Sequence, residues 1–289
     1  MRIPLPPVPL PDRLVEVARE FEDGRQEPAE PRNAATVILM RPSDEGPEVY
    51  YLRRHVSMEF AGGMCVYPGG GVDPRDFDSS VAWAGPTPEE WAARLGCDEE
   101  TARALVCAAV RETFEESGVL LAGTSASDVV ADTTGEDWEA DRVALESRDL
   151  SMTEFLNDRG LVLRTDLLGV WDAWLTPIFE PKRYRTWFFV ASLPLGQVTR
   201  DVSTESSSVA WIPARTAADQ ADAGDLALMP PTYLTSLEVG SLSSPDEVLS
   251  VAASRSVEMF TPSVEPLGSG WTLSMPDRLR PMLAERHRA

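Results

Sequence analysis

The chain has 289 residues, 43% of them hydrophobic and 25% charged, which is the composition of a globular protein rather than a disordered one. Its 26 basic and 47 acidic residues give a net charge of −21. This charge argues against nucleic acid and anionic membrane as main partners, because both require a cationic surface. A small anionic substrate is compatible with it if the site supplies local basic residues or a bound metal ion.

The cysteines and the N-terminus bear on the compartment. Cys65, Cys97 and Cys107 are too few and too scattered for a disulfide framework or a paired-cysteine metal site, so a reducing compartment is the simplest interpretation. The proline-rich N-terminus lacks the apolar segment of a signal peptide, and no stretch reaches the roughly 18 apolar residues of a membrane span. We therefore expect a cytoplasmic protein.

The first part of the chain predicts a helix and a strand hairpin. Residues 1–11 are too rich in proline for a helix, whereas Asp12 can cap a short helix over 13–22. Residues 34–40 are apolar on both faces of a strand, as in a buried central strand, and residues 48–54 are the expected hairpin partner. A short strand is expected between the glycines that follow.

Two helices with strong capping signals come next. Residues 87–90 (Thr-Pro-Glu-Glu) form a capping box with proline at the first helical position, and Gly96 is expected to end this helix. Asp98 is expected to cap a longer helix that runs to about Ser117 and ends at Gly118.

The rest of the chain mixes strands and helices without regular alternation. The acidic segment 124–149 predicts a surface insertion with one helix, and a final strand is possible after Arg255. Since no repeat or long linker divides the chain, an α/β or α+β layered domain fits best. Strands are predicted at 161–163, 168–175, 184–193 and 208–212, and helices at 214–223, 232–239 and 245–254.

The most informative segment is 111–119, Arg-Glu-Thr-Phe-Glu-Glu-Ser-Gly-Val. On a helix, Glu112, Glu115 and Glu116 fall within an arc of roughly 100°, opposite a set of apolar residues. Like charges at these spacings destabilise a helix by a few tenths of a kcal/mol per pair, and they lie near its unfavourable C-terminal end. Such a run alone is most often a solvated face. A hard divalent cation, Mg²⁺ or Mn²⁺, would compensate for the repulsion.

Two neighbouring features favour the metal interpretation. Arg111 can hold one carboxylate in place, and residues 67–76 (Tyr-Pro-Gly-Gly-Gly-Val-Asp-Pro-Arg-Asp) form a glycine-rich loop whose backbone can approach phosphates or a metal.

With these residues the sequence resembles the Nudix hydrolase family, whose box reads G, five residues, E, seven residues, R-E-U-x-E-E-x-G-U, with U a bulky apolar residue. Gly70 and Asp76 match the first half, with Asp in place of Glu, and 111–119 match the second, with Thr113 at the first U position. Residues 77–110 separate the halves, 34 residues in place of seven, which implies an insertion of 27.

The interrupted box resembles one branch in particular, the peroxisomal coenzyme A diphosphatases of mammals and their bacterial relatives. The resemblance covers most of residues 34–239. Glu59 stands where many coenzyme A-cleaving Nudix enzymes carry an arginine. Segments that resemble this branch are 52–54, 60–70, 109–112, 120–121, 174–177, 185–189 and 229–232.

The resemblance implies an α/β (α+β) fold, a Nudix-type mixed sheet sandwiched between helices, with helical insertions at 77–103 and 124–149. We expect an N-terminal proline-rich segment and short helix at 1–33, a Nudix hydrolase domain at 34–255 and a C-terminal tail at 256–289 that packs on the domain. Homodimers are common in the family, and a homodimer is therefore one possible assembly.

The implied activity is hydrolysis of the diphosphate in a nucleoside diphosphate linked to another group. The leading substrate is coenzyme A or an acyl derivative, giving 3′,5′-ADP and phosphopantetheine or acyl-phosphopantetheine. ADP-ribose or NADH is an alternative substrate. A non-catalytic Nudix-fold nucleotide-binding regulator is an alternative of another class, which the retained glutamates of the box disfavour.

The resemblance also implies roles for single residues. Arg111 would orient Glu112 through a bidentate contact. The general base would be Glu205, in the loop before a predicted strand, or Glu112 itself, although Glu205 can equally be a plain loop carboxylate. The implied ligands of Mg²⁺ or Mn²⁺ are Glu112, Glu115, Glu116 and the backbone carbonyl of Gly70.

Basic residues near these segments are candidates for binding substrate phosphates. Strand alternation places Arg183 and Arg185 on one face with Trp187 and Phe189. Ion pairs with surface acids are the alternative in so acidic a chain. The candidates are Arg53, Arg54, Lys182, Arg183 and Arg185.

Overall fold

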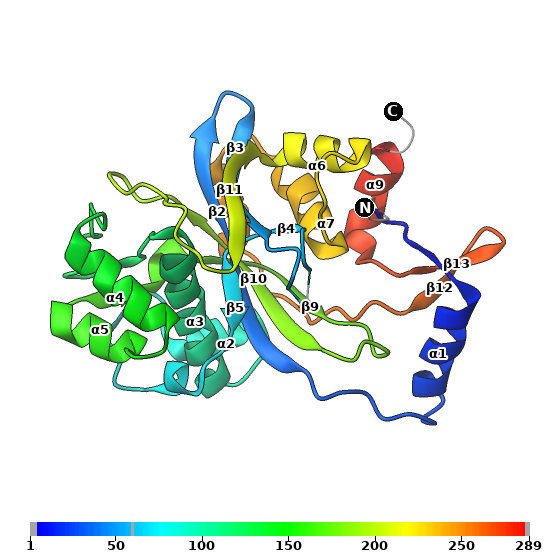
Figure 1. The fold of residues 1–289 in the computed structure, drawn as a ribbon, viewed down its shortest axis with the longest axis horizontal. Coiled ribbons are helices and arrows are strands. Elements are labelled where there is room, and N and C mark those ends of the chain that lie inside the picture. The colour runs from blue at the N-terminus through cyan, green and yellow to red at the C-terminus, as the bar shows by residue number, and fades with distance from the viewer. Residues whose placement is uncertain (1–4, 59–60, 287–289) are drawn as a thin grey trace.

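A seven-stranded mixed sheet forms the centre of the protein (Figure 1). The structure is a computed structural model that describes residues 5–58 and 61–286, so Glu59 lies outside it. Five strands follow the order β11-β3-β2-β10-β9, while β4 pairs with β3 and β5 pairs with β2. The strands are β2 (Arg32–Ser43), β3 (Gly46–Arg54), β4 (Cys65–Val66), β5 (Gly69–Gly71), β9 (Gly169–Leu175), β10 (Tyr184–Ser192) and β11 (Ser206–Pro213).

Strand β2 is the central strand that the apolar run predicts. Its residues 32–40 run parallel to β10. Its other edge is shared, because residues 34–36 pair with the glycine strand β5 and residues 40–43 pair with β3. The glycine strand therefore lies at the first half of β2. At Gly69 a Cβ atom would lie 2.4 Å from the carbonyl oxygen of Ala35, so glycine is required there.

Helices cover both faces of the sheet, which confirms the predicted sandwich (Figure 1). Alternate residues of β2 enter two separate apolar cores: Val37 and Leu39 pack with α2 and α3, whereas Ile38 and Met40 pack with α6, α7 and α8. The helices of these layers are α2 (Pro88–Leu95), α3 (Glu99–Ser117), α6 (Ala214–Ala223), α7 (Pro230–Val239) and α8 (Pro245–Ala253).

The capping signals before α2 and α3 act as predicted. Thr87 and Glu90 form the capping box of α2, Asp98 caps α3, and α3 ends at Gly118 with a left-handed φ of 73°. One cap differs: Asp12 is the first residue of α1 (Asp12–Glu22) and Pro11 holds the N-cap position.

Two helices, α5 (Met152–Arg159) and α9 (Arg280–Arg286), are absent from the sequence prediction. The signal for α5 is the capping box formed by Ser151 and Glu154. Together with α4 (Glu136–Glu146), α5 lies over α3, so that α3 is buried on nearly every side (Figure 1).

The two expected insertions and the two ends of the chain build the periphery. Strand β6 (Trp83–Ala84) joins β7 (Ala122–Gly123) and β8 (Val162–Arg164) in a small sheet beside α3. At the other end of the molecule, β1 (Pro9–Leu10) pairs with β13 (Gly270–Leu273), which pairs with β12 (Val264–Leu267). Further short elements are α9 (Arg280–Arg286) and the 3₁₀ turns η1 (Pro74–Phe77), η2 (Thr165–Leu167) and η3 (Asp277–Leu279). Within the described ranges, no helix combines the length and apolar character needed to cross a membrane.

Candidate active site

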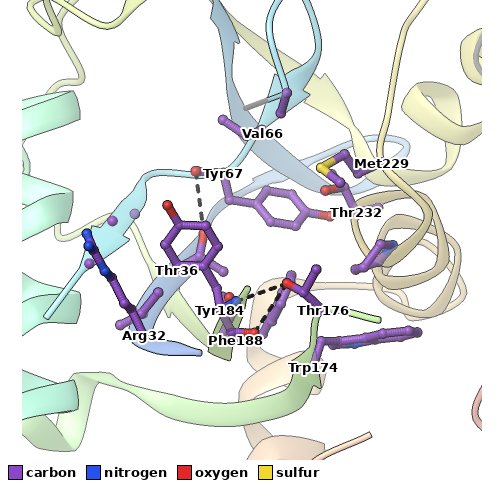
Figure 2. A pocket seen from close by; sticks show the side chains of 18 of the residues that line it. Arg32, Thr36, Val66, Tyr67, Trp174, Thr176, Tyr184, Phe188, Met229 and Thr232 are labelled. Carbon is purple, nitrogen blue, oxygen red and sulfur yellow. Dashed lines mark hydrogen bonds between the residues drawn. The ribbon is translucent and has the colours of Figure 1, made fainter. Parts of the chain in front are cut away.

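A cavity of about 1330 Å³ lies beside the first half of β2. At one end it is lined by β5 and the last turns of α3, and at the other by Trp174, Phe188 and the start of α7 (Figure 2). Residues 273–275 of the C-terminal tail and Pro6 near the N-terminus contribute to its wall. The volume exceeds the ~300–1,000 Å³ of most small-molecule sites, so the cavity has room for an extended ligand.

Two glutamates of α3 contact the glycine strand, and a third, Glu115, lines the cavity beside them. Glu112 packs directly on Gly70, where a Cβ atom would lie 2.6 Å from the carboxylate. Glu116 accepts a hydrogen bond of 2.7 Å from the backbone N–H of Gly69. Glu115 and Glu116 are only 7% and 8% exposed. Glycines on β5 thus let buried carboxylates approach the main chain closely.

Arg111 connects these carboxylates to the 3₁₀ turn η1. Its Nε and Nη2 atoms each donate to Asp76 at 3.0 Å, and Nη1 donates to Glu112 at 2.8 Å and to Glu115 at 3.1 Å. The predicted bidentate contact between Arg111 and Glu112 is therefore wrong, because the bidentate partner is Asp76. The turn η1 presents Asp76 through a capping box with Asp73.

The carboxylates in this cluster hold protons more tightly than free glutamates. Burial raises the pKa of Glu112 to about 7, against the opposing effect of the Arg111 charge. Burial also raises the pKa of Glu115, and it raises that of Glu116 strongly, with the charge of Glu112 adding to the effect. Three carboxylates, those of Asp76, Glu112 and Glu115, share one guanidinium here, and Glu116 lies beside them without an arginine partner of its own among the described residues. Buried charge of one sign is costly without a counter-ion.

The oxygen atoms of the cluster are suitable ligands for a hard divalent cation. Carboxylate oxygens and a main-chain carbonyl are the ligands that Mg²⁺ and Mn²⁺ prefer. In the described part of the chain, however, no three His, Cys, Asp or Glu side chains are arranged to hold a metal ion as they stand. Glu112 and Glu115 bond to the guanidinium of Arg111, whereas Glu116 bonds to the backbone N–H of Gly69. The three carboxylates would have to turn away from these donors to bind one ion together.

Glu205 and Arg54 line the cavity close enough to the cluster for their charges to act on Glu116. Glu205 lies in the loop before β11 and accepts a 3.1 Å hydrogen bond from Arg54. Both residues line the cavity, and the charge of Glu205 contributes to raising the pKa of Glu116. The Glu205 side chain is 54% exposed, whereas Arg54 is 17% exposed and its Nε is buried without a partner in the part of the chain described here.

The other predicted substrate-binding residues do not all reach the cavity. Lys182 lines the cavity, whereas Arg53 does not. Arg183 is buried and donates to the carbonyls of Thr176 and Ala29.

Arg185 donates to the carbonyl of Pro31 and pairs with Glu30. Arg183 and Arg185 thus tie β10 to the segment before β2, and neither of them lines the cavity.

Comparison with known proteins links this site to a family. A family model described as the NUDT19 Nudix domain matches residues 96–237, which include α3. A Caenorhabditis elegans protein named as nudix hydrolase 7 is 29% identical over 205 residues, which are 69% of this chain and 57% of that protein. The matched family model and this relative are both Nudix proteins, so the chain is similar to the Nudix hydrolase family.

A solved Nudix structure has the same fold. The crystal structure of a Nudix hydrolase from Alicyclobacillus acidocaldarius matches with a TM-score of 0.64 at 24% identity, covering 77% of this chain and 96% of that one. This chain therefore spans nearly all of that bacterial Nudix hydrolase, but only a little over half of the curated C. elegans relative.

The cavity contains further residues that sequence reasoning missed. Arg32 and Tyr184 are register partners on β2 and β10, and both side chains reach into the cavity from its floor (Figure 2). The guanidinium of Arg32 makes no hydrogen bond or ion pair with any described residue. Extending the predicted strand by two residues toward the N-terminus would have placed Arg32 on the face of Ala34 and Thr36.

A buried group of hydroxyls supports the glycine-rich loop of residues 67–76. The Tyr67 hydroxyl lies 2.8 Å from the hydroxyl of Ser236 and donates to the Thr232 carbonyl, both on α7 (Figure 2). Tyr51 shares the same Ser236 hydroxyl at 2.8 Å. Because Tyr67 precedes Gly69 by two residues, these bonds fix the start of α7 relative to the glycine strand.

Proposed function

We propose that this Nudix chain is a diphosphatase that depends on Mg²⁺ or Mn²⁺ and hydrolyses a nucleoside diphosphate derivative. Coenzyme A or an acyl derivative is the proposed substrate, with 3′,5′-ADP and phosphopantetheine or its acyl form as products. The observation that carries the proposal is the buried cluster beside the glycine strand, in which Glu112, Glu115 and Asp76 share Arg111 and Glu116 accepts from the backbone N–H of Gly69.

The ion would be held by the carboxylates of Glu112, Glu115 and Glu116 and by the carbonyl of Gly70. When bound, it would make a water molecule more acidic and neutralise charge on the leaving phosphate. Arg111 keeps the carboxylates oriented from behind, and its pairing with Asp76 anchors it to the turn η1.

Glu205 is the proposed general base. Its carboxylate lines the cavity and is exposed enough to contact water, so it can take the proton from the water that attacks phosphorus in line. Glu112 is the alternative base within the box. Arg54 and Lys182 also line the cavity and would bind the phosphate oxygens.

The shape of the cavity supports a substrate with a large second group. Beyond the carboxylates, the wall becomes apolar and aromatic at Trp174, Phe188 and Met229 (Figure 2). This end suits the part of the ligand that carries no diphosphate. The interrupted box is the feature of the sequence that favours coenzyme A over ADP-ribose or NADH.

The test is a parallel assay of the purified protein with Mg²⁺ or Mn²⁺ against coenzyme A, dephospho-coenzyme A, ADP-ribose and NADH, with products separated by chromatography. Release of 3′,5′-ADP from coenzyme A, lost in Glu112→Gln, supports the proposal. Preference for ADP-ribose or NADH would retain the chemistry and reject the substrate. Binding of the ion without cleavage of any compound would instead support a nucleotide-binding regulator.

A further inference from the structure

Helix α4 in segment 124–149 contacts the carboxylate helix through a buried arginine. Arg142 is only 3% exposed, and its Nη1 donates a 2.8 Å hydrogen bond to the backbone carbonyl of Glu115. The same guanidinium pairs with Glu139 at 2.7 Å and with Glu146 at 3.0 Å. An acidic helix is thereby attached to the last turns of α3.

The same face of this helix also contacts the loop that carries Glu205. One carboxylate oxygen of Glu146 accepts two hydrogen bonds from Thr204, 3.0 Å from its backbone N–H and 2.7 Å from its hydroxyl. The second oxygen of Glu146 accepts from Arg142. The Glu146 side chain therefore links Arg142, which contacts Glu115, to Thr204, which directly precedes Glu205.

A second contact fixes the beginning of the same loop. Arg200 donates to Glu139 at 2.5 Å, and its backbone N–H donates to the carbonyl of Ser117 at 2.9 Å. Arg200 also donates to the carbonyl of Thr133. Residues 200–204 are therefore held at both ends by α4 and by the C-terminal end of α3.

We propose that α4 is a positioning element of the catalytic site: Glu146, anchored by Arg142, holds Thr204 so that the Glu205 carboxylate faces the glutamates of α3. The inference rests on the proposed function, since it requires Glu205 to take part in the reaction. Glu205 is half exposed and pairs with Arg54, so the orientation of its loop depends on contacts such as that of Thr204. A misplacement of about 1 Å can cost 10²-fold in rate.

The decisive experiment is a double-mutant cycle between Glu146→Ala and Glu205→Gln. Glu146→Ala should lower kcat by about 10-fold or more with KM within about twofold. In the Glu205→Gln background the same change should have almost no further effect, because the residue through which Glu146 acts is already lost. Glu146→Gln retains an acceptor oxygen for Thr204 and should recover most of the loss. Glu136→Ala, an exposed change on the same helix, is the control and should match wild type.

Several results would overturn the inference. Glu146 also lines the cavity. If Glu146→Ala lowers kcat equally in wild type and in Glu205→Gln, Glu146 acts on the ligand directly and not through Glu205. If Glu146→Ala leaves kcat unchanged, or if Glu146→Gln does not recover the lost kcat, the contact between Glu146 and Thr204 does not position Glu205. If Glu112→Gln abolishes hydrolysis while Glu205→Gln does not, the proposed diphosphatase stands and the positioning role is wrong.

Hydrogen exchange provides a measurement that does not depend on activity. The Thr204 amide is bonded to Glu146, so Glu146→Ala should raise exchange in residues 200–206, whereas Glu136→Ala should not. If wild type hydrolyses none of the four compounds, the proposed function fails. Unchanged exchange in Glu146→Ala would show separately that α4 does not hold this loop.

Discussion

The contact between Gly70 and Glu112 makes a sharp prediction for Gly70→Ala. The new Cβ atom would lie 2.6 Å from the Glu112 carboxylate, whereas ordinary contacts begin near 3.5 Å. The carboxylate must therefore retreat by about 1 Å, a displacement that can cost on the order of 100-fold in kcat, or about 2.7 kcal/mol of transition-state stabilisation. Stability should change little, because the displaced group is the end of a side chain.

The adjacent residue supplies a matched control. At Gly71 the nearest atom to a new Cβ is the Asn33 carbonyl oxygen at 4.0 Å, so Gly71→Ala adds the same methyl group without displacing a carboxylate. We would measure kcat, KM and the melting temperature of both variants with Mg²⁺ and coenzyme A. If Gly70→Ala retains a kcat within about threefold of Gly71→Ala, the placement of Glu112 against the glycine strand is not needed for catalysis, and the reasoning is refuted.

Three further changes test other parts of the structure. Arg32→Gln should raise KM about 10-fold for a substrate with an additional phosphate, since a charge-assisted hydrogen bond contributes about 1.5–3 kcal/mol; initial rates on coenzyme A and dephospho-coenzyme A check this, and equal effects on both contradict it. The hydrogen bond from Arg75 lowers the pKa of Asp73 from 3.8 to about 2, so ionised Asp73 stabilises the fold above pH 4 and this stability is lost as the pH falls toward 2. Asp73→Asn, which can still cap η1, should lower the free energy of unfolding by about 2 kcal/mol at pH 7 and leave it unchanged near pH 2, as measured by urea unfolding. A loss of stability that does not vary with pH would exclude the ion pair as its cause. Mg²⁺ at 100-fold above its Kd should stabilise wild type by about 2.7 kcal/mol and Glu112→Gln much less, as measured by thermal unfolding with and without a chelator; equal shifts would place the ion elsewhere.

Local signals predicted the elements well because their causes are local. The capping residues Thr87 and Asp98 act on backbone groups within one turn, so the starts of α2 and α3 were readable from sequence. The hairpin of β2 and β3 followed from the apolar run and the turn between them.

The tertiary partners could not be derived in this way. Alternation correctly places Arg183 and Arg185 on one face, but it cannot tell which face of the sheet borders the cavity. The bidentate partner of Arg111 depends on where the turn η1 docks against α3, and its 35-residue separation from Asp76 carries no local signal. The burial of Glu115 and Glu116 depends in the same way on the packing around α3.

The cavity wall joins segments from opposite ends of the chain. Strand β1 pairs with β13, and Pro6 and residues 273–275 both border the cavity, about 270 positions apart. Ligand binding is therefore thermodynamically linked to the docking of both terminal segments. A ligand that fills this end should suppress their local opening, so that protease resistance far from the Nudix box would report occupancy of the site.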